Sequence, residues 1–126
     1  MAEIVEACAI AGSLVHEDPH EGMSQLFVGN TEYVTRTWFG RVFAKYLRPY
    51  DALRWLERSR EYIANYGRWR LEYRGEGHAI MHKYDEYFWL DALKGSCEGM
   101  LNVCGVRGIV RCELDSPFCG RLVIRW

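Results

Sequence analysis

The spacing of apolar residues changes along this chain, and the change limits the folds that it can adopt. From Thr31 to Tyr66 apolar side chains recur every three or four positions, which predicts two consecutive helices. In RWRLEYR, residues 68–74, they recur at every second position, which predicts a half-buried strand with an arginine-rich outer face. HAIMHKY then predicts a return strand after a turn at residues 75–77.

The second half of the chain repeats this change of spacing. An apolar stripe in EYFWLDALKGSCEGMLNVCG predicts a third helix, which Asp85 opens and Gly105 ends. Two glycines four positions apart in it, Gly95 and Gly99, favour close packing of another element against its backbone. GIVRCEL and GRLVIRW predict a final hairpin around Asp115-Ser116-Pro117.

Helix-capping and helix-terminating residues predict where the first two helices begin and end. After a turn at Gly29-Asn30, Asn30 or Thr31 is expected to cap the first helix, and Pro49 to end it. Asp51 is expected to cap the second helix, and Gly67 to stop it.

The predicted order is therefore helix, helix, hairpin, helix, hairpin. This order indicates an α+β fold, an antiparallel sheet of two hairpins with helices packed on one face. A chain of 126 residues fits a single domain over residues 1–126. Residues 1–30 are the least readable part, because residues 3–15 fit either a short helix or a strand.

Charge is unevenly distributed, although the net charge is only −1. The first 35 residues carry six acids and no Lys or Arg, so this part can attract the more basic remainder, within the chain or between subunits. A nucleic-acid-binding protein usually has a stronger basic excess, so no nucleic-acid partner is expected. No apolar run approaches the ~20 residues of a membrane span, and the acidic N-terminus, unlike a signal peptide, predicts a complete cytoplasmic chain.

Three segments carry a resemblance to a known family: REYIANYGRWRLEY, the stretch YFWLDALKGSCEGMLNVCGVRGIVRCELDSPFCGRLVIRW, and its terminal IRW. Residues 31–126 resemble 4-vinyl reductase domains, whose superfamily includes haem nitric-oxide-binding domains and Bet3-type transport subunits. The likeness is greatest to a bacterial, myxobacterial paralogous family of unknown function. The resemblance implies the α+β fold and a role in signalling or trafficking assemblies, as a dimeric scaffold or a binder of small apolar ligands, and seldom as an enzyme.

The resemblance also implies a candidate zinc site, because some relatives bind Zn²⁺ through cysteines of the last hairpin and of the helix before it. The candidate ligands are Cys97, Cys112 and Cys119, with Cys104, Glu113, His78 and His82 as further candidates. Cys97 and Cys104 also lie on the apolar stripe, where free cysteine usually behaves as a small hydrophobic residue. Buried thiols are the favoured interpretation, zinc is the alternative, and no other cofactor is expected.

Sequence motifs for catalysis are missing from the chain. No Gly-x-Ser-x-Gly and no phosphate-binding loop occur, so no catalytic residue is assigned and a non-enzymatic protein is expected. The segment from His16 to Glu21 holds two histidines and three acids. These side chains fit a metal or acid–base cluster, but a solvated loop is favoured.

Aromatic residues make up 14% of the chain. They can line a pocket between the helices and the sheet, or fill the core or a dimer interface. The candidate ligand-binding residues are Trp38, Phe39, Phe43, Trp55, Tyr62, Tyr66, Phe88 and Trp89.

Together these patterns favour a non-enzymatic regulatory or scaffold domain that dimerises or docks on a protein partner through its helices. The adjacent rings Trp38/Phe39 and Phe88/Trp89 are too bulky for one helix stripe, so some are expected to face a partner or ligand. The alternative is a sensor domain that binds a small hydrophobic or aromatic ligand, with or without a structural zinc.

Overall fold

The computed structural model of the chain describes residues 2–44, 46–63, 67–85, 89–116 and 119–126, and for residues 2, 38–44 and 63 it describes the backbone alone. Within these ranges the chain forms four helices and a four-stranded antiparallel sheet. The elements are α1 (Ala2–Ser13), α2 (Pro19–Ala44), α3 (Pro49–Ile63), β1 (Arg68–Gly75), β2 (His78–Tyr84), α4 (Leu90–Val103), β3 (Ile109–Ser116) and β4 (Cys119–Arg125). The predicted α+β class and the predicted order of helices and hairpins are confirmed, and α1 precedes them.

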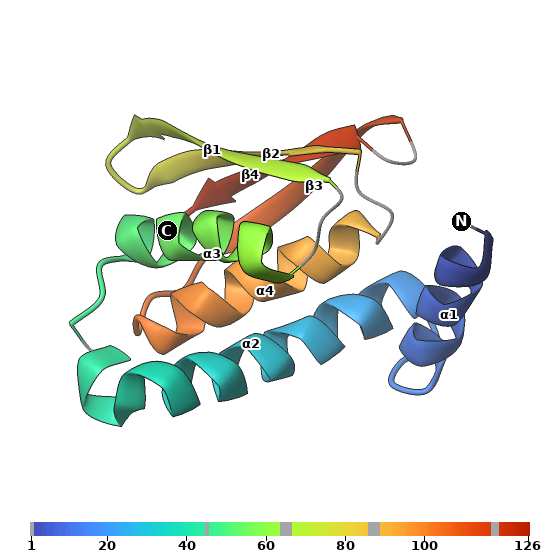
Figure 1. Cartoon of the computed structure of the whole chain (residues 1–126), viewed down its shortest axis with the longest axis horizontal. Coiled ribbons are helices and arrows are strands. Elements are labelled where there is room, and N and C mark those ends of the chain that lie inside the picture. Colours follow the sequence, from blue (N-terminus) through green and yellow to red (C-terminus); the bar gives the residue numbers. More distant parts are fainter. Residues whose placement is uncertain (1, 45, 64–66, 86–88, 117–118) are drawn as a thin grey trace.

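The elements are stacked in three layers, which Figure 1 shows edge-on. The sheet, with strand order β1-β2-β4-β3, forms the first layer. Helices α3 and α4 cover one face of the sheet, and α2 packs on the side of α4 that is turned away from the sheet. The described part of the chain places no helix on the second sheet face. None of the described helices is long and apolar enough to cross a membrane.

The main core lies between the sheet and the two helices of the middle layer. The predicted stripe of α4 is confirmed for Leu90, Leu93, Cys97 and Leu101, which are all buried, whereas its last member, Cys104, is half-buried at the end of the helix. The other buried members of this core come from α3, from the inner face of the sheet and from the same helix: Ala52, Leu53, Leu56, Ala79, Met81, Met100, Val110, Leu122 and Ile124. A smaller cluster of Cys8, Met23 and Ala92 joins α1 to α2 and α4.

The two glycines of α4 allow α2 to approach very closely, as their spacing predicts. A Cβ atom at Gly95 would overlap the carbonyl oxygen of Ser24, and one at Gly99 would lie 2.8 Å from the carbonyl oxygen of Val28. A hydrogen atom is the only side chain that fits at these two positions. The α2–α4 contact is therefore built on backbone as much as on side chains.

Helix α2 corrects the prediction for the N-terminal region. It runs without a break from Pro19 to Ala44, so the turn expected at Gly29-Asn30 and the cap expected at Asn30 or Thr31 are wrong. The side that packs on α4 buries Ser24, Thr31 and Thr35, which are small and polar. Because these polar residues do not contribute to an apolar repeat, the sequence pattern does not predict the first half of α2. The division between residues 1–30 and 31–126 that the sequence suggests therefore falls inside one helix.

Two other helix ends also differ from the prediction. Helix α4 begins at Leu90 with Trp89 at the cap position, whereas Asp85 has a φ of 50° outside the helix. Pro49 opens α3 instead of ending α2, which fits the preference of proline for the first helical turn. Ala52 N–H donates to the carbonyl oxygen of Arg48, so α3 starts before Asp51.

The predicted turn of the first hairpin and the predicted end of α4 are confirmed. Gly75 and Gly77 have φ values of 141° and 71°, which favour glycine, and they join β1 to β2. Gly105 has a φ of 76° directly after α4. Gly67 also has a positive φ, of 72°, and leads into β1.

Candidate functional site

The uncovered face of the sheet, called here the outer sheet face, is built from alternate residues of all four strands. Successive residues of a strand point to opposite faces, and cross-strand partners share a face. Leu71, Met81 and Leu122 are partners on the core side, so their neighbours in the chain lie outside. The outer sheet face consists of Arg68, Arg70, Glu72, Arg74, His78, Ile80, His82, Tyr84, Ile109, Arg111, Glu113, Arg121, Val123 and Arg125.

Glu113 organises one end of this face. Its two carboxylate oxygens accept hydrogen bonds from Arg111 at 3.0 Å and from Arg121 at 2.5 Å. The hydrogen bond from Arg121 is the main reason that the pKa of Glu113 lies below its ordinary value of 4.5. The carboxylate thus stays ionised and holds two guanidinium groups side by side.

Glu72 plays the same part at the other end of the face. His82 Nε2 donates to its carboxylate at 2.8 Å, and Arg74 lies 3.3 Å from the other oxygen. The hydrogen bond from His82 is the main cause that lowers the pKa of Glu72 from 4.5. Next to this group the guanidinium of Arg68 stacks over the ring of Tyr84, 5.0 Å from its centroid.

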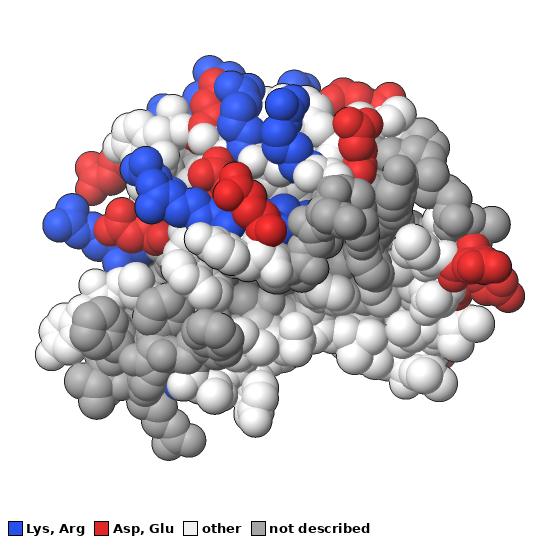
Figure 2. Space-filling model, in the orientation of Figure 1, with Lys and Arg blue, Asp and Glu red and all other residues white. Residues whose placement is uncertain are grey.

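The net result is a positively charged face with an apolar centre. Six of the chain's arginines lie on it against two glutamates, and Arg70 and Arg125 form no ion pair within the described residues. Ile80 and Val123 are cross-strand partners in the middle of the sheet and are half-buried. Figure 2 shows basic side chains over the sheet with acidic side chains among them, and a further acidic group at the end that carries α1.

The predicted aromatic site is only partly described. The side chains of Trp38, Phe39, Phe43, Tyr66 and Phe88 lie outside the described residues. Trp55 packs at the margin of the main core, and Tyr62 is 91% exposed. Trp89 stacks on His20, with ring centroids 4.1 Å apart, at the N-terminal end of α4. The three described rings thus lie at separate places and do not form one pocket.

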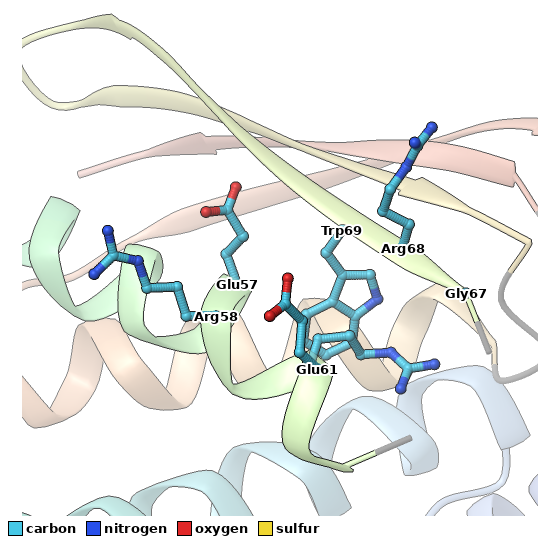
Figure 3. Close-up of a pocket in the computed structure, with 7 residues that line it drawn as sticks. Glu57, Arg58, Glu61, Gly67, Arg68 and Trp69 are labelled. Carbon is cyan, nitrogen blue, oxygen red and sulfur yellow. The ribbon is translucent and has the colours of Figure 1, made fainter. Parts of the chain in front are cut away.

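A cleft of about 500 Å³ lies between α3 and β1, and its lining is mainly charged. Figure 3 shows Trp69 standing between the strand and the helix, with Glu57, Arg58 and Glu61 projecting from α3. Glu57 accepts a hydrogen bond from the backbone N–H of Leu71 and so occupies the free edge of β1. The sequence pattern predicts that Trp69 faces the core, and of the candidate ligand-binding aromatics with described side chains, Trp55, Tyr62 and Trp89, none lines this cleft.

The candidate zinc ligands are divided between the two faces of the sheet: Cys97 of α4 and Cys112 of β3 lie on the core side and are close enough to interact electrostatically, whereas Cys119 lies apart from them. Cys112 is a partner of Leu122 on the core side of the sheet, while Cys119 precedes Gly120 and faces the other side. Burial raises the pKa of Cys97, and raises those of Cys104 and Cys112 to about 11, so these thiols are protonated near neutral pH. Within the described ranges no three His, Cys, Asp or Glu side chains form a metal-binding group.

In the histidine-rich segment, residues 16–21, one histidine makes a structural contact with α4. His20, at the start of α2, has its Nδ1 atom 2.7 Å from Asp91 Oδ2 on α4. His16 Nδ1 accepts a hydrogen bond from the backbone N–H of Asp18 at 3.0 Å. Sequence reasoning did not find the pairing with Asp91, because 71 positions separate the two residues.

The outer sheet face is the one feature with a clear recognition chemistry. Oriented guanidinium groups bind carboxylates through two parallel hydrogen bonds, and a central apolar strip adds a hydrophobic contact. The arginine-rich outer face of β1 is predicted by the sequence, but the sequence of this one strand does not indicate a binding role. The contributions of β3 and β4 could be found only once the strand order was known.

Comparison with known proteins does not extend this picture. No family model matches the chain, and no curated protein sequence matches it. The resemblance to 4-vinyl reductase domains therefore stays a prediction.

Proposed function

We propose that this chain is a non-enzymatic interaction domain that docks an acidic protein surface onto its outer sheet face. The observation that carries the proposal is the ordered set of arginines on the uncovered face of the sheet. Glu72 and Glu113 hold four of the face's basic side chains, Arg74, His82, Arg111 and Arg121, in place. Arginine-rich faces with a half-buried apolar centre are typical of protein interfaces.

Two features favour a protein over a nucleic acid as the partner. The glutamates sit among the arginines, where they would repel a phosphate backbone. The chain as a whole has a net charge of −1, and its first 35 residues are acidic without a compensating base. A surface of alternating charge suits a partner that offers carboxylates together with some donors.

The alternative of a small-molecule sensor receives no support from a described cavity. Among the described residues, the cleft between α3 and β1 is lined by four charged side chains from α3, by Arg68 and by one aromatic ring, that of Trp69. Pockets for apolar ligands are lined mainly by apolar and aromatic groups. The docking role is thus the better supported of the two functions expected from the sequence.

The proposal is tested by fluorescence anisotropy with a labelled synthetic helical peptide that carries glutamate and leucine on one side. We expect salt-sensitive binding that is weakened more than about tenfold by the double variant Arg70→Glu/Arg125→Glu, because like charges then face each other. Arg54→Glu/Arg58→Glu, on the exposed side of α3, makes the same change of charge elsewhere and should bind as the unaltered chain does.

Two outcomes would overturn the proposal. One is equal binding of the peptide by both double variants. The other is tighter binding of a mixed-sequence single-stranded DNA that shows the same dependence on Arg70 and Arg125, which would make the face a nucleic-acid site.

A further inference from the structure

The chain itself carries a surface that complements the outer sheet face. Along α1, Glu3, Glu6, Ile10 and Leu14 are spaced by three, four and four positions, so they share one side of the helix. All four are exposed, and Leu14 continues the last turn through a hydrogen bond from its N–H to the carbonyl oxygen of Ile10. This side, called here the α1 stripe, is acidic at its beginning and apolar at its end.

The apolar half of the α1 stripe is unusually open to solvent. Ile10 is 57% exposed and Leu14 is 83% exposed. Exposed apolar groups that gather on one short helix commonly mark an interaction site. A surface that binds the α1 stripe therefore has to offer partners for its carboxylates and apolar contacts for its aliphatic side chains.

The α1 stripe cannot turn onto the sheet of its own chain while α1 keeps its packing. Cys8, on the opposite side of α1, is buried with Met23 and Ala92. The backbones of α1 and α2 also touch, because a Cβ at Gly12 would overlap Pro19 and one at Gly22 would overlap Gly12. These contacts hold α1 at one end of the molecule (Figure 1), and the residues of its stripe are exposed there.

We propose that the acidic surface docked by the outer sheet face is the α1 stripe of a second copy of this chain. The proposal rests on the docking role proposed above and names its partner. Glu3 and Glu6 of one copy meet arginines of the other. Ile10 and Leu14 cover the strip of Ile80 and Val123 at the centre of the sheet. Both kinds of contact are needed, since exposed ion pairs alone contribute little.

Each copy has one stripe and one outer sheet face, so two copies can exchange them reciprocally. Such an exchange is closed by a two-fold axis and leaves neither surface free. The predicted assembly is a dimer that weakens as salt screens the charges. The charge asymmetry of the chain, acidic in its first 35 residues and basic beyond, then serves self-recognition.

The test uses two full-length double variants and their mixture, followed by sedimentation velocity over a concentration series. Arg70→Glu/Arg125→Glu makes the sheet face acidic, and Glu3→Arg/Glu6→Arg makes the stripe basic. Each variant alone sets like charges against each other, so its dimer dissociation constant should rise more than about tenfold. In the equimolar mixture both contacts are again complementary, so a heterodimer should form with near-original affinity.

Two controls separate this contact from general attraction. Arg54→Glu/Arg58→Glu, on α3, should dimerise as the unaltered chain does and should not pair with the stripe variant. Ile10→Ser leaves all charges in place and should still weaken the dimer severalfold, because it removes the apolar half of the contact. Circular dichroism and thermal unfolding check that every variant is folded.

Three results would overturn the proposal: an unaltered chain that stays monomeric at all concentrations, a dimer that persists in either reversal variant, and a mixture that does not form a heterodimer. Assemblies larger than a dimer would exclude reciprocal exchange. If the chain is monomeric but the acidic peptide still binds in a manner that depends on Arg70 and Arg125, the docking function stands and only the partner named here is wrong.

Discussion

At the scale of single residues, two glutamates decide how the outer sheet face presents its arginines. Glu113 is bound by Arg111 and Arg121, and Glu72 by His82 and Arg74. A carboxylate between basic side chains limits their rotation, so the guanidinium groups need less ordering when a partner arrives. The same hydrogen bonds also make the stability of the fold depend on pH.

Acid is expected to destabilise the protein through these two carboxylates. The folded-state pKa of each lies below 4.5, so the unfolded chain binds more protons, and stability falls as pH drops from above 4.5 through the folded-state pKa. Thermal unfolding between neutral pH and pH 3 should show a falling midpoint, and the slope should be flatter in Glu72→Gln and Glu113→Gln. Unchanged slopes in both variants would contradict this assignment.

At the scale of elements, the contact between α2 and α4 sets the third layer. It depends on glycines in α4 that face the backbone of α2 and on small polar residues in α2. Thr35 is buried there, and its hydroxyl donates a hydrogen bond to the sulfur of Met100 at 3.1 Å. Because this interface has little room, it should respond strongly to a single added methyl group.

Replacing Gly95 with Ala is expected to lower the free energy of unfolding by about 1–3 kcal/mol, because overpacking outweighs the better helix propensity of alanine. Gly29→Ala is the matched control. Gly29 also lies inside a helix, but a Cβ there meets nothing within 4 Å, so a gain of up to ~1 kcal/mol is expected. Chemical denaturation of both variants measures the difference. A Gly95→Ala protein as stable as the unaltered chain would show that the two helices are further apart.

At the scale of the whole molecule, stability is unevenly distributed over the three layers. Helix α4 has the sheet on one side and α2 on the other, and ten of its residues are buried. Helix α1 is attached through the small cluster that contains Cys8 and through the close backbone contact of Gly12 with the start of α2, and none of its described side chains belongs to the main core. Local opening is easiest where few apolar contacts hold an element.

Hydrogen exchange followed by mass spectrometry should therefore rank the helices. At low protein concentration we expect the amides of α4 to exchange slowest and those of α1 fastest. If the α1 stripe of each copy docks on the sheet of the other, raising the protein concentration should slow hydrogen exchange at the amides of α1 and of the sheet. Equal protection of α1 and α4 in dilute solution would contradict the ranking.

Much of the fold could be predicted from the sequence, because burial imposes a period on each element. The alternation of Trp69 and Leu71 with arginines, and the stripe from Leu90 to Leu101, report directly which side faces the core. The glycine turn at residues 75–77 follows from backbone sterics alone. These signals are local, so one sequence was sufficient to place two hairpins and three of the helices.

The remainder was decided by contacts between distant segments. Helix α2 continues through Gly29-Asn30 because its small polar side packs on the glycines of α4, a match that neither segment reveals alone. The contact between His20 and Asp91 likewise joins two distant segments, and neither segment predicts it alone. The candidate site also comes from tertiary structure: periodicity tells which side of each strand is outward, but only the strand order β1-β2-β4-β3 assembles arginines from β1, β3 and β4 into one face.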